Sequence, residues 1–137
     1  MTPAERQTLA RLADVLVPAA GRMPSGSQAG VHERWLDRVL SARPDLAEPL
    51  TRLVRAADGR DPLGEIERLD RDDGDGLALL LSVVTAAYYL SPKVRRLIGY
   101  PGQRPNEVYP DQAEHDLREG ILDPVVARGP IWRQVPG

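Results

Sequence analysis

The acidic run from Asp70 to Gly76 is where side chains of one reactive type stand closest together in this sequence. Carboxylates alternating beside glycine are typical of a calcium loop, which needs oxygen ligands at positions 1, 3 and 5, glycine at 6 and glutamate at 12. When Gly76 is placed at position 6, Arg71 takes position 1 and Ser82 takes position 12. The register that begins at Asp70 puts an aspartate at position 6. Both registers fail, and we interpret the run as a solvated loop that ends in the N-cap of the next helix.

The histidines and serines are the second set of candidate reactive groups. Cysteine is absent, and neither His32 nor His115 has a second imidazole or a thiolate at metal-ligand spacing. A Ser–His–Asp arrangement could be assembled from Ser25 or Ser82 with His32, but no G-x-S-x-G turn marks a nucleophile. The glycines of the stretch 99–102 follow no strand, so they do not form a dinucleotide fingerprint. We therefore predict no catalytic, cofactor-binding or metal-binding residue in this chain.

The composition is that of one ordinary globular domain and argues against several kinds of partner. The net charge is -2 with both signs interspersed, whereas nucleic-acid binders show a basic excess and membrane-surface binders a polybasic segment. The longest uncharged run, Leu77 to Leu90, is shorter than the roughly 20 residues of a bilayer span. It predicts a central helix that is buried on all sides. The N-terminal residues show neither a twin-arginine pair nor an apolar run of secretory length, so we expect a cytoplasmic protein.

Apolar residues recur with a period near 3.6 and no segment alternates with a period of two, so the sequence predicts an all-α fold. We expect a small bundle of about five helices around the 77–90 helix. A Thr-Pro-x-Glu signal at residues 2–5 starts the first helix, and Ser25 or Ser27 is expected to cap the second. The expected helices are 3–17, 31–40, 45–57, 62–70 and 77–90, and a helical turn follows at 91–97.

An apolar stripe on each expected helix predicts the core. Its members recur three or four positions apart, so they lie on one face of their helix. The predicted core residues packed around the 77–90 helix are Leu9, Leu12, Ala13, Leu16, Val31, Trp35, Val39, Leu40, Leu46, Leu50, Leu53, Val54, Leu63, Ile66 and Leu69.

Residues 99–137 differ in character from the helical domain, which we place at 1–98. Prolines recur along them, which excludes a long helix and a sheet, and only one short helix, about 111–119, is expected. Aromatic and β-branched side chains are nevertheless frequent, unlike in disordered segments. We predict an extended Pro-rich tail that either folds back over the helical body or wraps a partner protein. The predicted partner interface consists of Tyr88, Tyr89, Tyr100, Pro101, Val108, Tyr109, Ile131 and Trp132.

Three stretches between residues 5 and 102 carry a resemblance to a known family. The first is Leu9-x-x-Leu12-Ala13-Asp14-x-Leu16-Val17-Pro18. The second is Pro24-Ser25-Gly26-Ser27-Gln28-Ala29-Gly30-Val31, followed by Leu36-Asp37-Arg38-x-Leu40. The third is Ala87-Tyr88-Tyr89-x-Ser91-Pro92-x-Val94, followed by Ile98-Gly99-Tyr100-Pro101-Gly102. In this order they resemble the gluconate 2-dehydrogenase subunit 3 family.

The resemblance implies a small helical subunit that accompanies a large flavin-dependent sugar or polyol dehydrogenase of the glucose–methanol–choline type. In that family the FAD and the base that accepts the sugar hydroxyl proton lie in the large subunit. The small subunit serves the folding, stability or export of the large one. Many members carry a twin-arginine signal, which this sequence does not show, so a cytoplasmic complex is expected. We therefore expect a non-catalytic subunit that binds and stabilises an FAD-containing partner.

Two other functions stay open at this point. One is a free-standing helical adaptor or regulator with no redox partner, which a neighbouring gene for a large FAD-binding chain would argue against. The other is a hydrolase or lyase that uses aspartate and histidine. It predicts a pocket that holds His32 or His115 beside a carboxylate.

Overall fold

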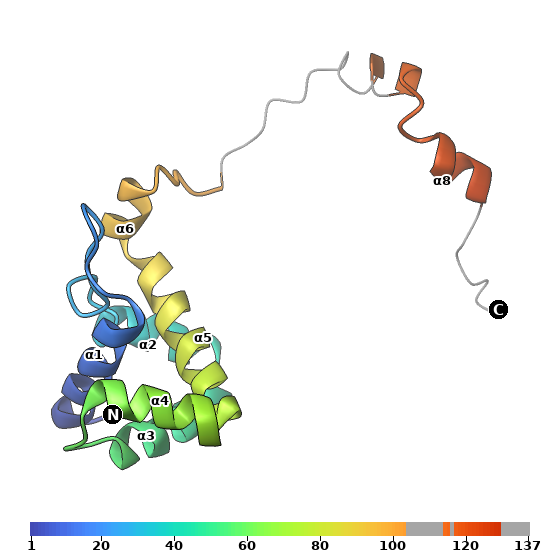
Figure 1. The fold of residues 1–137 in the computed structure, drawn as a ribbon. Coiled ribbons are helices and arrows are strands. Elements are labelled where there is room, and N and C mark those ends of the chain that lie inside the picture. Colours follow the sequence, from blue (N-terminus) through green and yellow to red (C-terminus); the bar gives the residue numbers. More distant parts are fainter. Residues whose placement is uncertain (104–113, 116, 130–137) are drawn as a thin grey trace. The chain divides into compact units, whose positions relative to one another are not determined.

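A computed structural model describes residues 1–103, 114–115 and 117–129 of the chain (Figure 1). The chain divides into two compact units, Met1–Gly102 and Gln103–Gly137. Within the described residues every regular element is a helix, apart from an isolated bridge between Ala20 and Met23. The predicted all-α fold is confirmed. No helix in this part of the chain combines the length and the hydropathy that crossing a membrane requires.

The first unit is a bundle in which one long helix contacts most of the others (Figure 1). Its elements are α1 (Pro3–Leu16), α2 (Arg34–Ala42), the 3-10 helix η1 (Pro44–Leu46), α3 (Ala47–Ala56), α4 (Pro62–Asp72), α5 (Gly74–Leu90) and α6 (Pro92–Leu97). α5 contacts α2, α3, α4 and α6, while α1 packs against α3 and α4. α5 contains residues 77–90, so the prediction that this segment forms the central helix is confirmed.

Side-chain caps start α1 and α4. The Thr2 hydroxyl accepts from the Glu5 amide at 3.3 Å, and the Glu5 carboxylate accepts from the Thr2 amide at 2.6 Å. This capping box is the one that the sequence predicts. At the start of α4, the Asp61 carboxylate accepts from the Gly64 amide at 2.8 Å.

The acidic run also resolves into a cap. The Asp73 carboxylate accepts from the Gly76 amide at 2.9 Å and starts α5, which confirms the N-cap interpretation. The preceding aspartates are part of α4, which extends through Asp72, so Asp73 alone separates the two helices. A carboxylate there also faces the positive end of the α5 dipole.

The start of α2 differs from the expectation. The helix begins at Arg34, not at 31, and has no side-chain cap. Ser25 and Ser27 are engaged elsewhere: the Ser27 hydroxyl donates to the Asp14 carboxylate at 2.7 Å and lies 3.3 Å from the Ser25 hydroxyl. Because these side chains tie the chain to α1, residues 26–33 form turns instead of a first helical turn.

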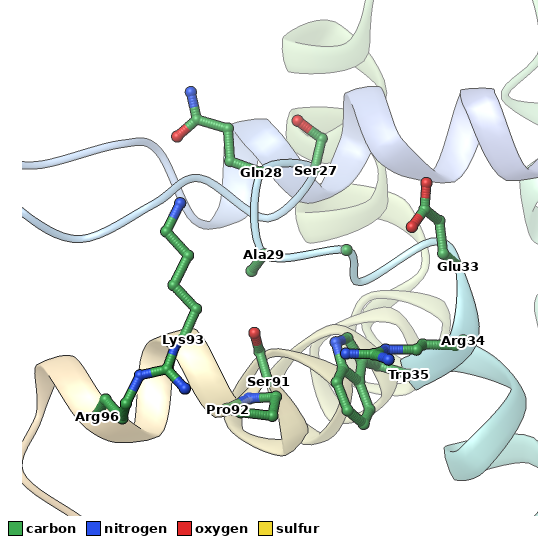
Figure 2. A pocket seen from close by; sticks show the side chains of 11 residues that line it. Ser27, Gln28, Ala29, Glu33, Arg34, Trp35, Ser91, Pro92, Lys93 and Arg96 are labelled. Atoms are coloured by element: carbon green, nitrogen blue, oxygen red, sulfur yellow. The ribbon is translucent and has the colours of Figure 1, made fainter.

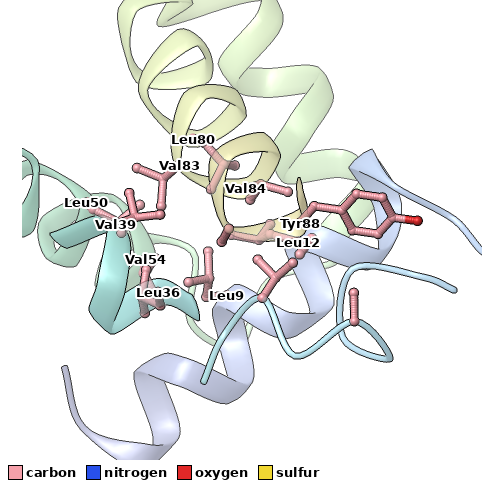
Figure 3. Packing of buried hydrophobic residues seen from close by; sticks show 14 of the residues in the cluster. Leu9, Leu12, Leu36, Val39, Leu50, Val54, Leu80, Val83, Val84 and Tyr88 are labelled. Carbon is pink, nitrogen blue, oxygen red and sulfur yellow. The ribbon is translucent and has the colours of Figure 1, made fainter. Parts of the chain in front are cut away.

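The core lies where the predicted stripes meet (Figure 3). Several residues differ from the prediction: Leu36, Ala29, Ala57 and Val94 are buried in the core although the predicted stripes do not contain them, and Leu63 is exposed although they do. Since α2 starts at Arg34, Val31 does not share its periodicity, and Leu36 is buried one helical turn before Val39 on the same side of α2. The largest fully buried side chains are Leu9, Leu12, Val31, Leu36, Leu50, Val54, Leu69, Leu80, Val83, Val84 and Val94.

α5 is central, as predicted. The prediction that it is buried on all sides is wrong, because part of its surface is exposed. Leu80, Val83 and Val84 are fully buried, whereas Leu81 and Tyr89 are exposed. The uncharged run 77–90 hides this difference, because its exposed residues carry no charge either. The exposed face mixes Leu81 and Tyr89 with Ser82 and Thr85, and its apolar members are candidates for contact with another protein.

The second unit contains a helix that the sequence analysis missed, α8 (Asp123–Arg128). Pro124 lies in its first turn, where proline is tolerated because its missing amide has no helical partner, and Gly129 follows its end with a positive φ of 69°. The prolines of this region predict extended chain, and the structure has a short helix there instead. Residues 114, 115, 117 and 118 are helical, within the predicted helix 111–119, whose remaining N-terminal part lies outside the described residues.

Candidate functional site

The loop between α1 and α2, residues 18–33, is held by side chains that are far apart in sequence. The Asp14 carboxylate of α1 accepts from the amide and from the hydroxyl of Ser27, each at 2.7 Å. The buried Tyr88 hydroxyl of α5 donates to the Pro24 carbonyl oxygen at 2.7 Å, and burial raises the pKa of this hydroxyl. We name these two sets of hydrogen bonds the loop clamp. They join residues from all three stretches that carry the family resemblance.

Gly26 lets this loop lie directly on α1. Its amide donates to the Val17 carbonyl oxygen at 3.0 Å. A Cβ at Gly26 would come within 2.7 Å of the Ala13 carbonyl oxygen and 2.8 Å of the Ala13 Cβ. These atoms belong to the helix backbone and its first side-chain carbon, so a larger residue must displace the loop.

Gly26→Ala is therefore expected to lower the free energy of unfolding by about 1–2 kcal/mol, the cost of forcing an extra methyl group into packed structure. Gly74→Ala is the matched control, because nothing lies within 4 Å of a Cβ there. It is expected to be neutral or stabilising by up to about 1 kcal/mol. Chemical denaturation measures both variants, and equal stabilities would contradict the close contact of loop and helix.

The electrostatics of the loop clamp favour an ionised Asp14. Burial alone would raise the pKa of its carboxyl, but hydrogen bonds from the Ser27 amide and from the Ser25 and Ser27 hydroxyls outweigh burial. Its pKa consequently lies below the ordinary value. Folding therefore favours the charged form of this side chain.

Asp14→Asn is expected to lower the free energy of unfolding by about 1 kcal/mol near neutral pH, where charge-assisted hydrogen bonds are intact. With a lowered folded pKa, this stabilisation is full above the unfolded pKa of about 3.9 and is lost as the pH falls through the folded value. The difference between wild type and variant should therefore shrink below about pH 4. Denaturation at neutral and acidic pH tests this, with the exposed Asp70→Asn as control; a difference that does not change with pH would contradict the ionic clamp.

The cluster around Ser27 does not form a Ser–His–Asp relay. Asp14 accepts directly from Ser27, with no imidazole between them. His32 Nε2 lies 3.7 Å from the Glu33 carboxylate, and His32 Nδ1 is buried with no hydrogen-bond partner among the described residues. Within that part of the chain, no three histidine, aspartate or glutamate side chains converge as metal ligands. The chemistry of this cluster is to hold the loop.

A cleft of about 830 Å³ opens beside the clamped loop, between the loop, the start of α2 and α6 (Figure 2). Lys93 and Arg96 reach into it from α6. On α2, the guanidinium of Arg34 lies over the ring of Trp35, 4.2 Å from its centroid. This stacking orients the guanidinium. Its N–H groups point outward in the plane of the guanidinium and can still donate to a ligand. We name this space the basic cleft.

Among the described residues, the cations of the basic cleft outnumber Glu33, the one acidic residue that lines it, and none of them is ion-paired with Glu33. Arg34, Lys93 and Arg96 form no ion pair with any acidic side chain in the part of the chain that the structure describes. Several arginines elsewhere in the first unit do, as Arg43 does with Asp45 at 2.7 Å. The cleft therefore presents a net positive charge to solvent and can receive an anionic group. The sequence analysis missed it, because its cations come from separate segments of the chain.

The predicted interface residues of the first unit divide into buried and exposed ones. Tyr88 is a correction: only 5% of it is exposed and its hydroxyl belongs to the loop clamp, so it is not available to a partner. Tyr89 and Tyr100 are half exposed, and Pro101 is exposed. The Tyr100 ring lies 5.3 Å from the guanidinium carbon of Arg95. Val108, Tyr109, Ile131 and Trp132 lie outside the described residues.

The second unit carries a denser set of exposed apolar side chains. In its described residues, each leucine, isoleucine and valine has more than two fifths of its surface exposed, and Val126 reaches 74%. These residues are Leu117, Ile121, Leu122, Val125 and Val126. None of them is in the predicted interface set, although the β-branched side chains of this segment predict that it packs on the helical body or on a partner. In the sequence these apolar residues recur three or four positions apart, which is typical of one face of a helix. The nearby prolines obscured this pattern.

None of the protein-family models, curated proteins and solved structures compared with this chain matches it. The molecule itself defines a small all-α protein with a clamped loop, a basic cleft and a second unit rich in exposed apolar side chains. These features carry the functional inference.

Proposed function

We propose that this chain is a non-catalytic small subunit that binds and stabilises a large FAD-dependent sugar or polyol oxidoreductase subunit. The observation that carries the proposal is the second unit, whose described leucine, isoleucine and valine side chains are all exposed. Burying such side chains stabilises by about 1.5–3 kcal/mol each, so a surface with several of them gains much from contact with another protein.

The exposed residues of the first unit extend the same reasoning. Tyr89 and Leu81 stand on the exposed face of α5, and Tyr100 follows α6. Tyrosine is among the residues that contribute most to binding at protein interfaces. Tyr109 and Trp132 stay sequence predictions of further anchors.

The identity of the partner rests on the family resemblance. Its support is that the three resembling stretches meet in space: Asp14 bonds to Ser27, and Tyr88 bonds to Pro24. On this proposal the FAD and the catalytic base belong to the partner, the complex is cytoplasmic, and this chain supplies binding surface.

The purified chain alone is expected to carry no flavin and to oxidise no sugar, because the proposal assigns both to the partner. Absorbance spectroscopy and a dye-reduction assay with sugars and polyols test this directly. A stoichiometric flavin on the isolated chain, or sugar oxidation by it, would overturn the proposal.

A further inference from the structure

Two hollows lie along the seam between α2 and α5. One is the basic cleft, where the start of α2 faces residues 91–92 beyond the end of α5. The other, of about 580 Å³, is lined by Val39 and Ala42 near the end of α2 and by Ala86 and Leu90 of α5. The two helices are antiparallel along this seam: the start of α2 lies opposite residues 91–92, and the end of α2 lies opposite Ala86 and Leu90. The two hollows share no lining residue but follow each other along α2, and we name them together the α2–α5 groove.

The two halves of the α2–α5 groove differ in chemistry. The hollow at Ala86 and Leu90 is walled mainly by hydrocarbon, and Ala86 is open to solvent. Arg38 stands beside it and, among the described residues, forms no ion pair. Arg38 lies one helical turn after Arg34, so the two belong to the same side of α2. An apolar half thus adjoins a half that is cationic.

We propose that the α2–α5 groove binds a peptide segment of the partner protein that carries apolar residues next to acidic ones. The apolar side chains fill the hollow at Ala86 and Leu90, and the carboxylates meet Arg34, Lys93 and Arg96. This proposal rests on the proposed function and specifies the chemistry of the partner at this site.

The spacing of the two halves sets the spacing within the peptide. From Ala86 to Pro92 the chain advances by about 9 Å at 1.5 Å per helical residue. An extended peptide covers that distance in about three residues at 3.3 Å each. The segment should therefore place its first carboxylate about three residues from its last apolar side chain.

Charge complementarity favours an acidic peptide over other anions. Arginine pairs with carboxylates in a fork of two hydrogen bonds, and the Arg34 guanidinium is already oriented by Trp35. A small inorganic anion would leave the apolar half unused. A nucleic acid would need a longer basic surface than this one, whose cations lie only at one end of the groove. The net charge of the chain is -2, which also argues against a nucleic-acid partner.

The test compares full-length variants in binding to the co-purified flavoprotein subunit. Lys93→Glu with Arg96→Glu reverses the cleft charge, and Ala86→Glu places a carboxylate in the apolar half. The matched controls are Arg52→Glu with Arg71→Glu, an equal charge change at exposed sites outside the groove, and Thr85→Glu, the residue beside Ala86. Circular dichroism and melting curves first verify that all variants are folded.

The groove variants are expected to bind the flavoprotein about tenfold or more weakly, and the cleft variant to lose most of the salt dependence of binding. The controls should stay within about threefold of wild type. Equal affinities for groove variants and controls would overturn the proposal. So would a groove variant that changes the hydrodynamic radius or the mass of the isolated chain, because the groove would then hold the chain's own acidic segment or a second copy.

A second measurement separates this proposal from the function on which it rests. A short fluorescent peptide with two leucines, a spacer of two residues and then three glutamates is titrated into the full chain, beside a scrambled peptide of the same composition. Wild type should prefer the ordered peptide, and the Lys93→Glu, Arg96→Glu variant should lose that preference. If no flavoprotein accompanies the chain but this preference is seen, the proposed function is wrong. The groove then binds an acidic peptide of a different partner protein. Equal binding of both peptides would overturn the groove itself.

Discussion

Leu80→Ala is expected to lower the free energy of unfolding by about 3 kcal/mol. Leu80 is fully buried in the middle of α5, where it meets side chains of the surrounding helices (Figure 3). Removing its branched end loses the transfer free energy of the deleted carbons and leaves a cavity that the packed helices fill only in part. A loss of this size is a large fraction of the 5–15 kcal/mol typical of a small protein.

Leu81→Ala is the matched control, because it makes the same chemical change at the next position of the same helix. Leu81 is 41% exposed, and alanine is at least as good a helix former as leucine. We expect its effect to stay within about 0.5 kcal/mol. Chemical denaturation of both variants gives the comparison, and similar losses would show that α5 is not oriented as the structure has it.

Ile121→Ser combined with Val126→Ser is expected to weaken binding to the flavoprotein partner by about 2 kcal/mol or more, a hot-spot effect. Both side chains are largely exposed in the second unit, one just before α8 and one within it. If a partner buries them, the hydroxyl groups lose the apolar gain and must be desolvated. The melting temperature of the isolated chain should stay nearly constant.

Leu63→Ser controls for a general loss of surface hydrophobicity. Leu63 is also an exposed apolar residue, with 54% of its surface accessible, but it lies on α4 of the first unit. We expect it to change partner affinity by less than about 0.5 kcal/mol, as for most surface substitutions. A double variant that lowers the melting temperature and leaves affinity unchanged would mean that these side chains stabilise the chain itself.

The parts of the fold that were predictable are those that local chemistry determines. The signal at residues 2–5 sets a helix start through hydrogen bonds within one turn, and so does Asp73. The apolar stripes of α1 and α3 follow from a period that neighbouring residues establish. The prediction of a small helical bundle needed little more than these local rules.

The features that escaped prediction depend on contacts between distant residues. Ser25 and Ser27 have the chemistry of helix caps, but Asp14 on α1 engages Ser27, so α2 starts later than expected. Arg34 and Lys93 are unremarkable in the sequence and meet only when α2 and α6 fold beside one loop. The exposed face of α5 likewise depends on which sides its neighbours cover.

The most direct test of the central proposal is to purify the tagged, full-length chain from its native cells and to identify what accompanies it. We expect a stable complex with a polypeptide several times larger, and a flavin spectrum with one FAD per large subunit. Mass measurement of the complex and absorbance spectroscopy together give the answer. A chain that emerges alone, free of flavin and well behaved as a monomer, would contradict the assignment as a flavoprotein subunit.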